Sequence, residues 1–292
     1  MTDKKCLIVI DANSVIHRAY HALPPLSTKT GEVVGAVYGF LLVFLRAVKE
    51  FQPDFIAVCF DVKGPTFRHQ KYEAYKAKRP PLPEDLGRQI AKVKEVLGAF
   101  GVSVFEKEGF EADDIIGTVS RLAPQKQAFP EIETVILSGD TDTLQLVNPK
   151  TRVYVLRKGV KDIVLYDEKM VGEKYQGLKP AQLLDFRALK GDASDNIPGV
   201  PGIGEKTALG LIGEYGTLEK VYENLPLIGA KVREKLIQNR EQAFFSRELG
   251  QIHQAVPIDF DLENCRWGNY DKEKAAQVLK DLEFFSLISR LP

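Results

Sequence analysis

The sequence predicts an α/β protein in which helices cover both faces of a mostly parallel sheet, with a smaller helical domain after it. Two observations support this fold class. In the first half of the chain, short runs of β-branched and aromatic residues alternate with amphipathic helical patterns, as in parallel strands joined by crossover helices. After about residue 177 the strand signal fades and helical patterns take over. We therefore expect two domains, residues 1–178 and residues 179–292.

The expected strands are short apolar runs, as is usual for strands buried between two layers of helices. They are residues 7–10, 55–60, 102–105 and 134–137, with further strands at 154–155 and 163–165. The expected helices of the first domain repeat apolar side chains at helical spacing, as in Leu86, Ile90 and Val93. They are residues 36–51, 84–100 and 112–122. In the second domain the helical patterns cover residues 180–190, 206–215, 217–224, 230–248 and 272–282.

The composition is that of an ordinary globular protein. Its 292 residues are 44% hydrophobic and 27% charged, which excludes disordered, collagen-like and disulfide-scaffold classes. Two of the three cysteines, Cys6 and Cys59, lie in apolar runs, where a thiol behaves as a small hydrophobic side chain. The first apolar run is interrupted by Asp11, too early for a signal peptide or a membrane span. We expect a cytoplasmic protein that does not bind a membrane.

Positive charge is concentrated in one segment, although the 40 basic and 40 acidic residues of the chain cancel. Residues 63–79 hold six lysines and arginines and one acid, Glu73. The same segment carries aromatic side chains, and this mixture is typical of surfaces that bind phosphates and stack on unpaired bases. Arg68, Lys71 and Tyr72 are therefore candidate nucleic-acid contacts, with a solvated basic helix as the alternative.

Acidic residues follow one expected strand after another, at the edge where open α/β sheets bind their ligands. The candidate metal ligands are Asp11, Asp61, Glu111, Asp113, Asp114, Asp140 and Asp142, with Asp192 and Asp195 at the start of the helical domain. Taken singly, such a residue is a common turn former or helix cap. Nine carboxylates at one edge, however, would repel one another unless cations held them together.

The types of these side chains indicate the metal. Oxygen ligands without histidine or cysteine suit Mg²⁺, for which Mn²⁺ can substitute. The four histidines have no zinc-binding spacing; His17 and His21 are four residues apart but lack the H-E-x-x-H pattern. Two or more hard cations would support hydrolysis or transfer at phosphorus.

A glycine-rich stretch at residues 196–208 invites three interpretations. Glu205 stands where a P-loop would bind phosphate, and no strand precedes the glycines as a dinucleotide fingerprint requires, so we reject both. A turn between two helices fits, because its backbone N–H groups can approach a DNA phosphate closely. The candidate contacts are Gly199, Gly202, Gly204, Lys206 and Thr207.

Five motifs together resemble the 5′-nuclease domain of bacterial DNA polymerase I and its flap-endonuclease relatives. They are Val-Ile-Asp-Ala-Asn-Ser at 9–14, Phe-Arg-His with Tyr-Lys-Ala-Lys-Arg-Pro-Pro within 67–81, Glu-Ala-Asp-Asp-Ile-Ile-Gly at 111–117, Ser-Gly-Asp-Thr-Asp at 138–142, and Gly-Asp-Ala-Ser-Asp-Asn-Ile-Pro-Gly-Val-Pro-Gly-Ile-Gly at 191–204. The resemblance covers essentially the whole chain.

This resemblance implies a PIN-like flap-nuclease fold with a helical arch at about residues 68–86, through which a single-stranded 5′ end passes. It also implies a helix-three-turn-helix at about residues 180–216, which holds the duplex backbone and carries a K⁺ ion. The nine carboxylates would be the metal cluster. The residues that engage the substrate near the scissile phosphate would be Arg18, Tyr75, Lys76 and Arg79.

The implied activity is that of a Mg²⁺-dependent 5′ to 3′ exonuclease and 5′ flap endonuclease, which hydrolyses DNA by a two-metal-ion mechanism in replication and repair. Its substrates would be DNA with a 5′ flap, a nick or a 5′ end. The chain stops at Pro292, which leaves no length for polymerase domains, so we expect no polymerase activity. We expect a monomer that can work beside a separate DNA polymerase.

Two other functions stay open at this point. A PIN-like ribonuclease would share the carboxylate site but usually lacks a second helical domain. A branched-DNA-binding module with a degenerate site would bind without cutting, and the complete set of carboxylates speaks against it.

Overall fold

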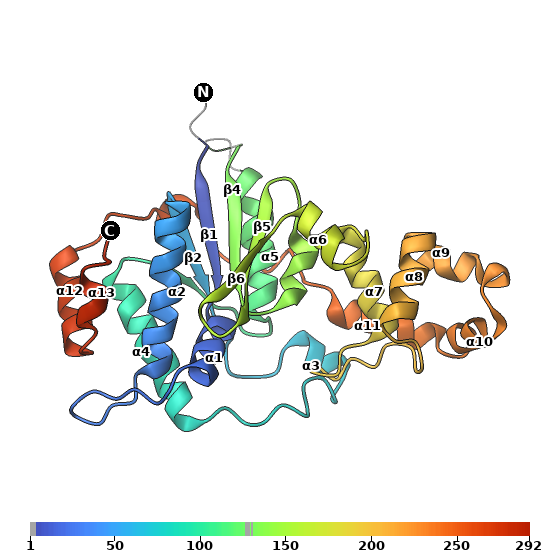
Figure 1. Ribbon diagram of the computed structural model, residues 1–292, viewed down its shortest axis with the longest axis horizontal. Coiled ribbons are helices and arrows are strands. Elements are labelled where there is room, and N and C mark those ends of the chain that lie inside the picture. Colours follow the sequence, from blue (N-terminus) through green and yellow to red (C-terminus); the bar gives the residue numbers. More distant parts are fainter. Residues whose placement is uncertain (1–3, 126–128, 130) are drawn as a thin grey trace.

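The computed structural model describes residues 4–125, 129 and 131–292, and is built around one six-stranded sheet (Figure 1). The strands are β1 (Cys6–Asp11), β2 (Phe55–Cys59), β3 (Ser103–Phe105), β4 (Glu133–Ser138), β5 (Thr151–Lys158) and β6 (Asp162–Tyr166). Their order is β3-β2-β1-β4-β5-β6, with all neighbours parallel except β5 and β6. The prediction of a mostly parallel sheet is confirmed, and its last two strands form an antiparallel hairpin.

Both faces of β1 are apolar because a layer of helices covers each of them. Ile8 and Ile10 belong to the core on one face, and Leu7 and Val9 to the core on the other. The first layer consists of α1 (Ala12–Ala22), α2 (Gly35–Phe51), α4 (Glu84–Ala99), α12 (Lys272–Asp281) and α13 (Phe285–Ile288). The second contains α5 (Ala112–Leu122), and its core continues into the helical end of the molecule.

That helical end lies far from α12 and α13 (Figure 1). Its helices are α6 (Glu168–Lys174), α7 (Leu183–Lys190), α8 (Glu205–Tyr215), α9 (Leu218–Glu223), α10 (Ala230–Gln238) and α11 (Arg240–Gly250). The single helix expected at residues 230–248 is broken, because Asn239 leaves the helical conformation, with φ −120° and ψ 26°. The helices α1, α6 and α13 have no counterpart among those expected.

The expected helical arch is helical over only a short part of its length. The helix α3 (Phe67–Lys71) is followed by turns and extended chain up to Pro83. Pro80, Pro81 and Pro83 lack the backbone N–H that a helix interior needs. Lys76 has a φ of +54°, which no right-handed helix contains. We call residues 67–83 the arch segment.

The last part of the chain returns to the sheet. Residue Trp267 donates its N–H to the carbonyl of Asp54, and Arg266 forms a β-bridge with Phe55. The helix α12 then packs against α4. Within the described ranges, no helix combines the length and the apolar character needed to cross a bilayer.

Candidate functional site

A cavity of about 500 Å³ opens where the carboxyl ends of β1, β2 and β4 meet. The strand order reverses at β1, which lies between β2 and β4, and such a switch point is where open α/β sheets bind ligands. Five of the nine predicted carboxylates line the cavity: Asp11, Asp61, Glu111, Asp113 and Asp140. The structure therefore brings together side chains that lie up to 129 residues apart in the sequence.

The carboxylate of Asp11 is fixed by hydroxyl and backbone donors. As the N-cap of α1 it accepts the N–H of Ser14 on Oδ1 at 3.1 Å, and the Ser138 hydroxyl donates to Oδ2 at 2.7 Å. Burial raises the pKa of Asp11 to about 6, and the charge of Asp61 adds to that rise. A cation beside Asp11 would lower this pKa again, because it stabilises the ionised carboxylate.

Two further carboxylates gather at the N-terminus of α5. Asp61 accepts the N–H of Ala112 on Oδ1 at 2.8 Å, and Glu111 is the N-cap residue of the helix. Negative side chains are stabilised at this position because the first N–H groups of a helix have no partner within it. The N-terminus of α5 thus holds both acids in the lining of the cavity.

Asp113 has the strongest need for a cation. Its Oδ1 atom is buried and has no hydrogen-bond partner among the described residues. Burial, together with the charges of Asp11 and Asp140, raises the pKa of Asp113 well above its usual value. An unpartnered, buried carboxylate oxygen surrounded by other acids fits a hard divalent cation.

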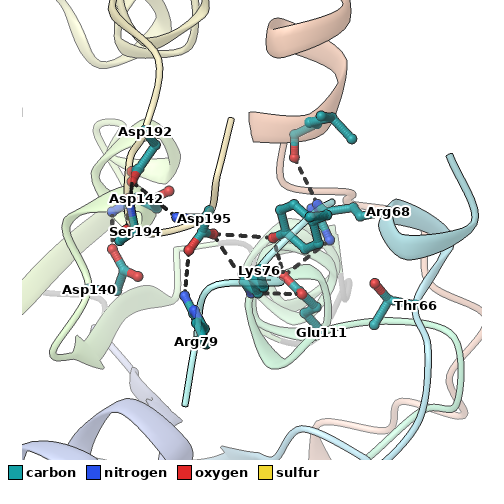
Figure 2. A network of polar contacts seen from close by, with 12 residues as sticks. Thr66, Arg68, Lys76, Arg79, Glu111, Asp140, Asp142, Asp192, Ser194 and Asp195 are labelled. Atoms are coloured by element: carbon teal, nitrogen blue, oxygen red, sulfur yellow. Dashed lines mark hydrogen bonds and ion pairs between the residues drawn. The ribbon is translucent and has the colours of Figure 1, made fainter. Parts of the chain in front are cut away.

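Four of the nine predicted carboxylates are paired with basic side chains, namely Asp114, described below, and three others. Lys76 donates to Glu111 at 2.7 Å, and Arg79 forms an ion pair with Asp195 (Figure 2). Arg187 forms an ion pair with Asp142. In the part of the chain that the structure describes, no three acidic, histidine or cysteine side chains enclose an ion as they stand. Mg²⁺ needs only one or two carboxylates and keeps several waters, so the carboxylates at the cavity still fit it.

The predicted ligands Asp142 and Asp195 lie behind the main cavity. With Asp113 they line a cavity of about 20 Å³, about the space that one water molecule needs. Asp192 lines neither of these two cavities: its Oδ1 accepts from the N–H and hydroxyl of Ser194, which is an Asx turn. Of the nine predicted ligands, five thus line the main cavity, Asp142 and Asp195 line the small one, and Asp114 and Asp192 line neither.

Two predictions are corrected by a buried ion pair. Asp114 is fully buried, and both its oxygens accept from the guanidinium of Arg68, at 2.7 and 2.8 Å. The same oxygens accept the N–H groups of Glu111 and His253, so Asp114 has no lone pair directed at a metal. Arg68 is 3% exposed and cannot reach DNA. Both residues hold the arch segment against α5.

The arch segment is tied to the glycine-rich turn, residues 191–204, near the carboxylates (Figure 2). The backbone N–H of Lys76 donates to the carbonyl of Asp195 at 2.9 Å, and Asn196 donates to the carbonyl of Ala74 at 2.7 Å. The hydroxyl of Tyr75 donates to Asp195 at 3.2 Å and to Glu111 at 3.1 Å. Tyr75, Lys76 and Arg79 therefore lie among the acids, and their contact with the scissile phosphate stays a prediction.

The remaining predicted DNA contacts lie outside the cavity. Arg18 donates to the carbonyls of Gly139 and Arg157. Lys71 forms an exposed ion pair with Glu248, and Tyr72 packs edge-on against Phe245. At the start of α8, Lys206 is exposed and Gly204 is the N-cap. Thr207 is half-buried in the same helical turn.

The tight fold of the glycine-rich turn depends on Gly199. Its φ is +61°, and a Cβ atom there would lie 2.3 Å from the backbone nitrogen of Gly191. We expect Gly199→Ala to lower the free energy of unfolding by about 2–4 kcal/mol, from left-handed strain and the backbone clash. Urea denaturation followed by circular dichroism measures it.

The matched control is Gly210→Ala in α8. A Cβ atom at Gly210 meets nothing within 4 Å, so this substitution should stabilise the helix by about 0.5–1 kcal/mol. If Gly199→Ala were as harmless as Gly210→Ala, the turn would not need its left-handed conformation.

Arg187, Ser138 and His17 belong to the site but were not predicted. Arg187 lies on α7 and reaches Asp142 only through tertiary packing, which no local pattern reveals. Ser138 could have been found, because it is the last residue of a strand beside the Asp11 strand. His17 lines the cavity from α1, beyond the carboxyl end of β1.

Comparison with known proteins supports both halves of the fold. Residues 6–176 match the family model for the 5′-3′ exonuclease N-terminal resolvase-like domain, and residues 178–273 match that for the 5′-3′ exonuclease C-terminal SAM fold. DNA polymerase I of Bacillus subtilis (strain 168) is 40% identical over 292 residues, which is 100% of this chain and 33% of that protein. DNA polymerase I of Caldicellulosiruptor bescii is 42% identical over 289 residues, 98% of this chain and 33% of its own. The chain thus spans about a third of these relatives' length.

Solved structures of the same fold are more distant in sequence. A bacteriophage T5 flap endonuclease, in a complex with DNA and metal ions, superposes with a TM-score of 0.70 at 20% identity, covering 96% of this chain and 100% of the other. The catalytic core of Rad2 in complex with DNA substrate gives a TM-score of 0.64 at 18% identity, covering 99% and 93%. At these identities the likeness shows the fold, and the predicted flap-nuclease architecture is confirmed.

Proposed function

The chain belongs to the 5′-3′ exonuclease family, and from this premise we propose that it is a divalent-metal-dependent nuclease that removes 5′ flaps and 5′ ends from DNA. The observation that carries the proposal is the meeting of Asp11, Asp61, Glu111, Asp113 and Asp140 at the switch point of the sheet. Two cations from the arch segment, Lys76 and Arg79, line the same cavity. Carboxylates for metal ions and cations for a phosphodiester thus share one cavity.

The proposed metal ligands are these five cavity residues, with Asp142 and Asp195 behind them. When bound, two Mg²⁺ ions, or Mn²⁺ in their place, would supply an acidified water and charge compensation at the phosphodiester. The ammonium of Lys76 and the guanidinium of Arg79 would neutralise charge that develops on the phosphate oxygens. Products would carry 5′-phosphate and 3′-hydroxyl ends.

The substrate is proposed to cross both halves of the molecule. The arch segment would receive the single-stranded 5′ end, because it combines the half-buried Tyr72 with exposed cations such as Lys78. The glycine-rich turn and Lys206 would hold the duplex backbone at the N-terminus of α8. A K⁺ ion held by backbone carbonyls of this turn is also part of the proposal.

We further propose that the boundary between the two domains lies at about residue 178. The protein would act as a monomer in DNA replication and repair, and would work with a DNA polymerase. The polymerase I relatives, in which a homologous region makes up a third of the protein, support this last point.

The test is cleavage of a 5′-labelled flap duplex and of its 3′-flap mirror, with Mg²⁺ or EDTA. We expect cutting of the 5′ flap alone, abolished by EDTA and reduced about 10²–10³-fold in Asp140→Ala, the range for loss of one preorganised electrostatic contact. An RNA 5′ flap cut in preference to DNA would favour a ribonuclease. Binding without cutting in either Mg²⁺ or Mn²⁺ would leave only a DNA-binding module.

A further inference from the structure

Arg187 is a basic residue inside the acidic cluster that the metal-binding proposal leaves without a role. It lies on α7, outside the arch segment, and its guanidinium contacts Oδ2 of Asp142. Both side chains are largely buried, Arg187 16% exposed and Asp142 18%. Asp142 shares the small cavity with Asp113, which also lines the main cavity, so this ion pair lies beside the group of acids that needs positive charge.

The surroundings of Asp142 show what Arg187 compensates. Asp140 is two residues away and its Oδ1 accepts the N–H of Asp142, so the two carboxylates are held close together. Asp113 lines the same small cavity and has a buried oxygen without a partner among the described residues. Three acids in so little space are unstable unless positive charge is present.

We propose that Arg187 is a positioning residue that serves as a built-in counter-ion at Asp142 and competes there with the divalent metal. The inference rests on the proposed metal site. The ion pair joins Nη1 of Arg187 to Oδ2 of Asp142 and so fixes that carboxylate beside the other acids. A fixed positive charge keeps the acids together without metal and lowers the attraction that a metal ion feels.

Thermodynamic linkage turns this into a measurable difference. If Arg187 stabilises the metal-free protein more than the metal-bound protein, it must weaken metal binding by the difference between these two free energies. Arg187→Gln should therefore lower the melting temperature without metal much more than at saturating Mg²⁺. It should also bind Mg²⁺ and Mn²⁺ roughly five- to tenfold more tightly in calorimetric titration, within the usual range of coupling between two sites.

The matched control is Arg247→Gln. Arg247 is a partly buried arginine paired with Asp185 and Glu219, away from the cavity. Its loss should lower the melting temperature equally with and without metal. Arg187→Lys, which keeps the charge, should stay close to the native protein in metal affinity.

The measurements on Arg187→Gln can support or overturn the inference. Equal destabilisation of Arg187→Gln with and without metal, and an unchanged dissociation constant, would reduce Arg187 to a structural residue and overturn the inference. If the variant does not fold without metal, recovery on adding Mg²⁺ supports the inference and failure to recover overturns it. A native protein that binds neither Mg²⁺ nor Mn²⁺ would instead remove the metal site of the proposed function.

Discussion

Replacing Arg68 by alanine is expected to lower the free energy of unfolding by about 3–5 kcal/mol, the cost of leaving one partner of a buried ion pair uncompensated. Arg68 donates to both oxygens of Asp114, and also to the carbonyls of Leu249 and Gln251 at 2.9 and 2.7 Å. Its loss would leave a fully buried carboxylate and two carbonyl groups short of donors. Chemical denaturation followed by circular dichroism measures the effect.

Arg266→Ala is the control for this substitution. Arg266 also bonds a carboxylate, that of Glu263 at 2.7 Å, but both side chains are about half exposed. Such a surface pair contributes no more than about 1 kcal/mol. Should the two alanine variants lose similar stability, the Arg68 ion pair would not be what holds the arch segment to α5.

Replacing Lys76 by alanine is expected to lower the single-turnover rate of flap cleavage about 10²–10³-fold, as for other preorganised charges at a reacting centre. The ammonium of Lys76 lies at the cavity, 2.7 Å from Glu111 and 3.8 Å from Asp195, with 19% of the side chain exposed. In this partly dehydrated position a positive charge acts strongly on a phosphate. Rapid-quench kinetics at saturating enzyme separates this step from binding.

Lys78 supplies the comparison within the same segment. It is exposed and does not line the cavity, so Lys78→Ala should change binding a few-fold, increasingly at low salt, and leave the single-turnover rate nearly unchanged. Equal rate losses in the two variants would mean that Lys76 acts through general attraction of DNA and not at the scissile phosphate.

The sheet and its acidic edge could be predicted because both depend on local patterns. An apolar run followed at once by Asp11, or after Ser138 and Gly139 by Asp140, indicates a strand end, and parallel strands bring their carboxyl ends to one edge. The role of Asp114 could not be predicted in this way. Its sequence neighbours suggest a ligand, but its partner Arg68 lies 46 residues earlier and is directed to it by tertiary packing.

The arch segment shows the same limit in the backbone. The resemblance to flap endonucleases implied a helix here, whereas Lys76 adopts a left-handed conformation that costs about 1–2 kcal/mol. The bond from its N–H to the carbonyl of Asp195, 119 residues later, holds that conformation. Arg187 was missed for a related reason, since nothing near it in sequence marks Asp142 as its partner.

The return of the C-terminal residues to the sheet determines when the protein can fold. Leu279 of α12 and Leu287 of α13 complete the core that contains Ile8 and Phe44 from the start of the chain. A ribosome makes these helices after the strands and helices that they cover, so one apolar layer of the sheet stays open to solvent and to other chains until they emerge. Contacts over such long separations also close slowly. The nascent chain therefore depends on protection from aggregation until the whole of residues 4–292 has been made.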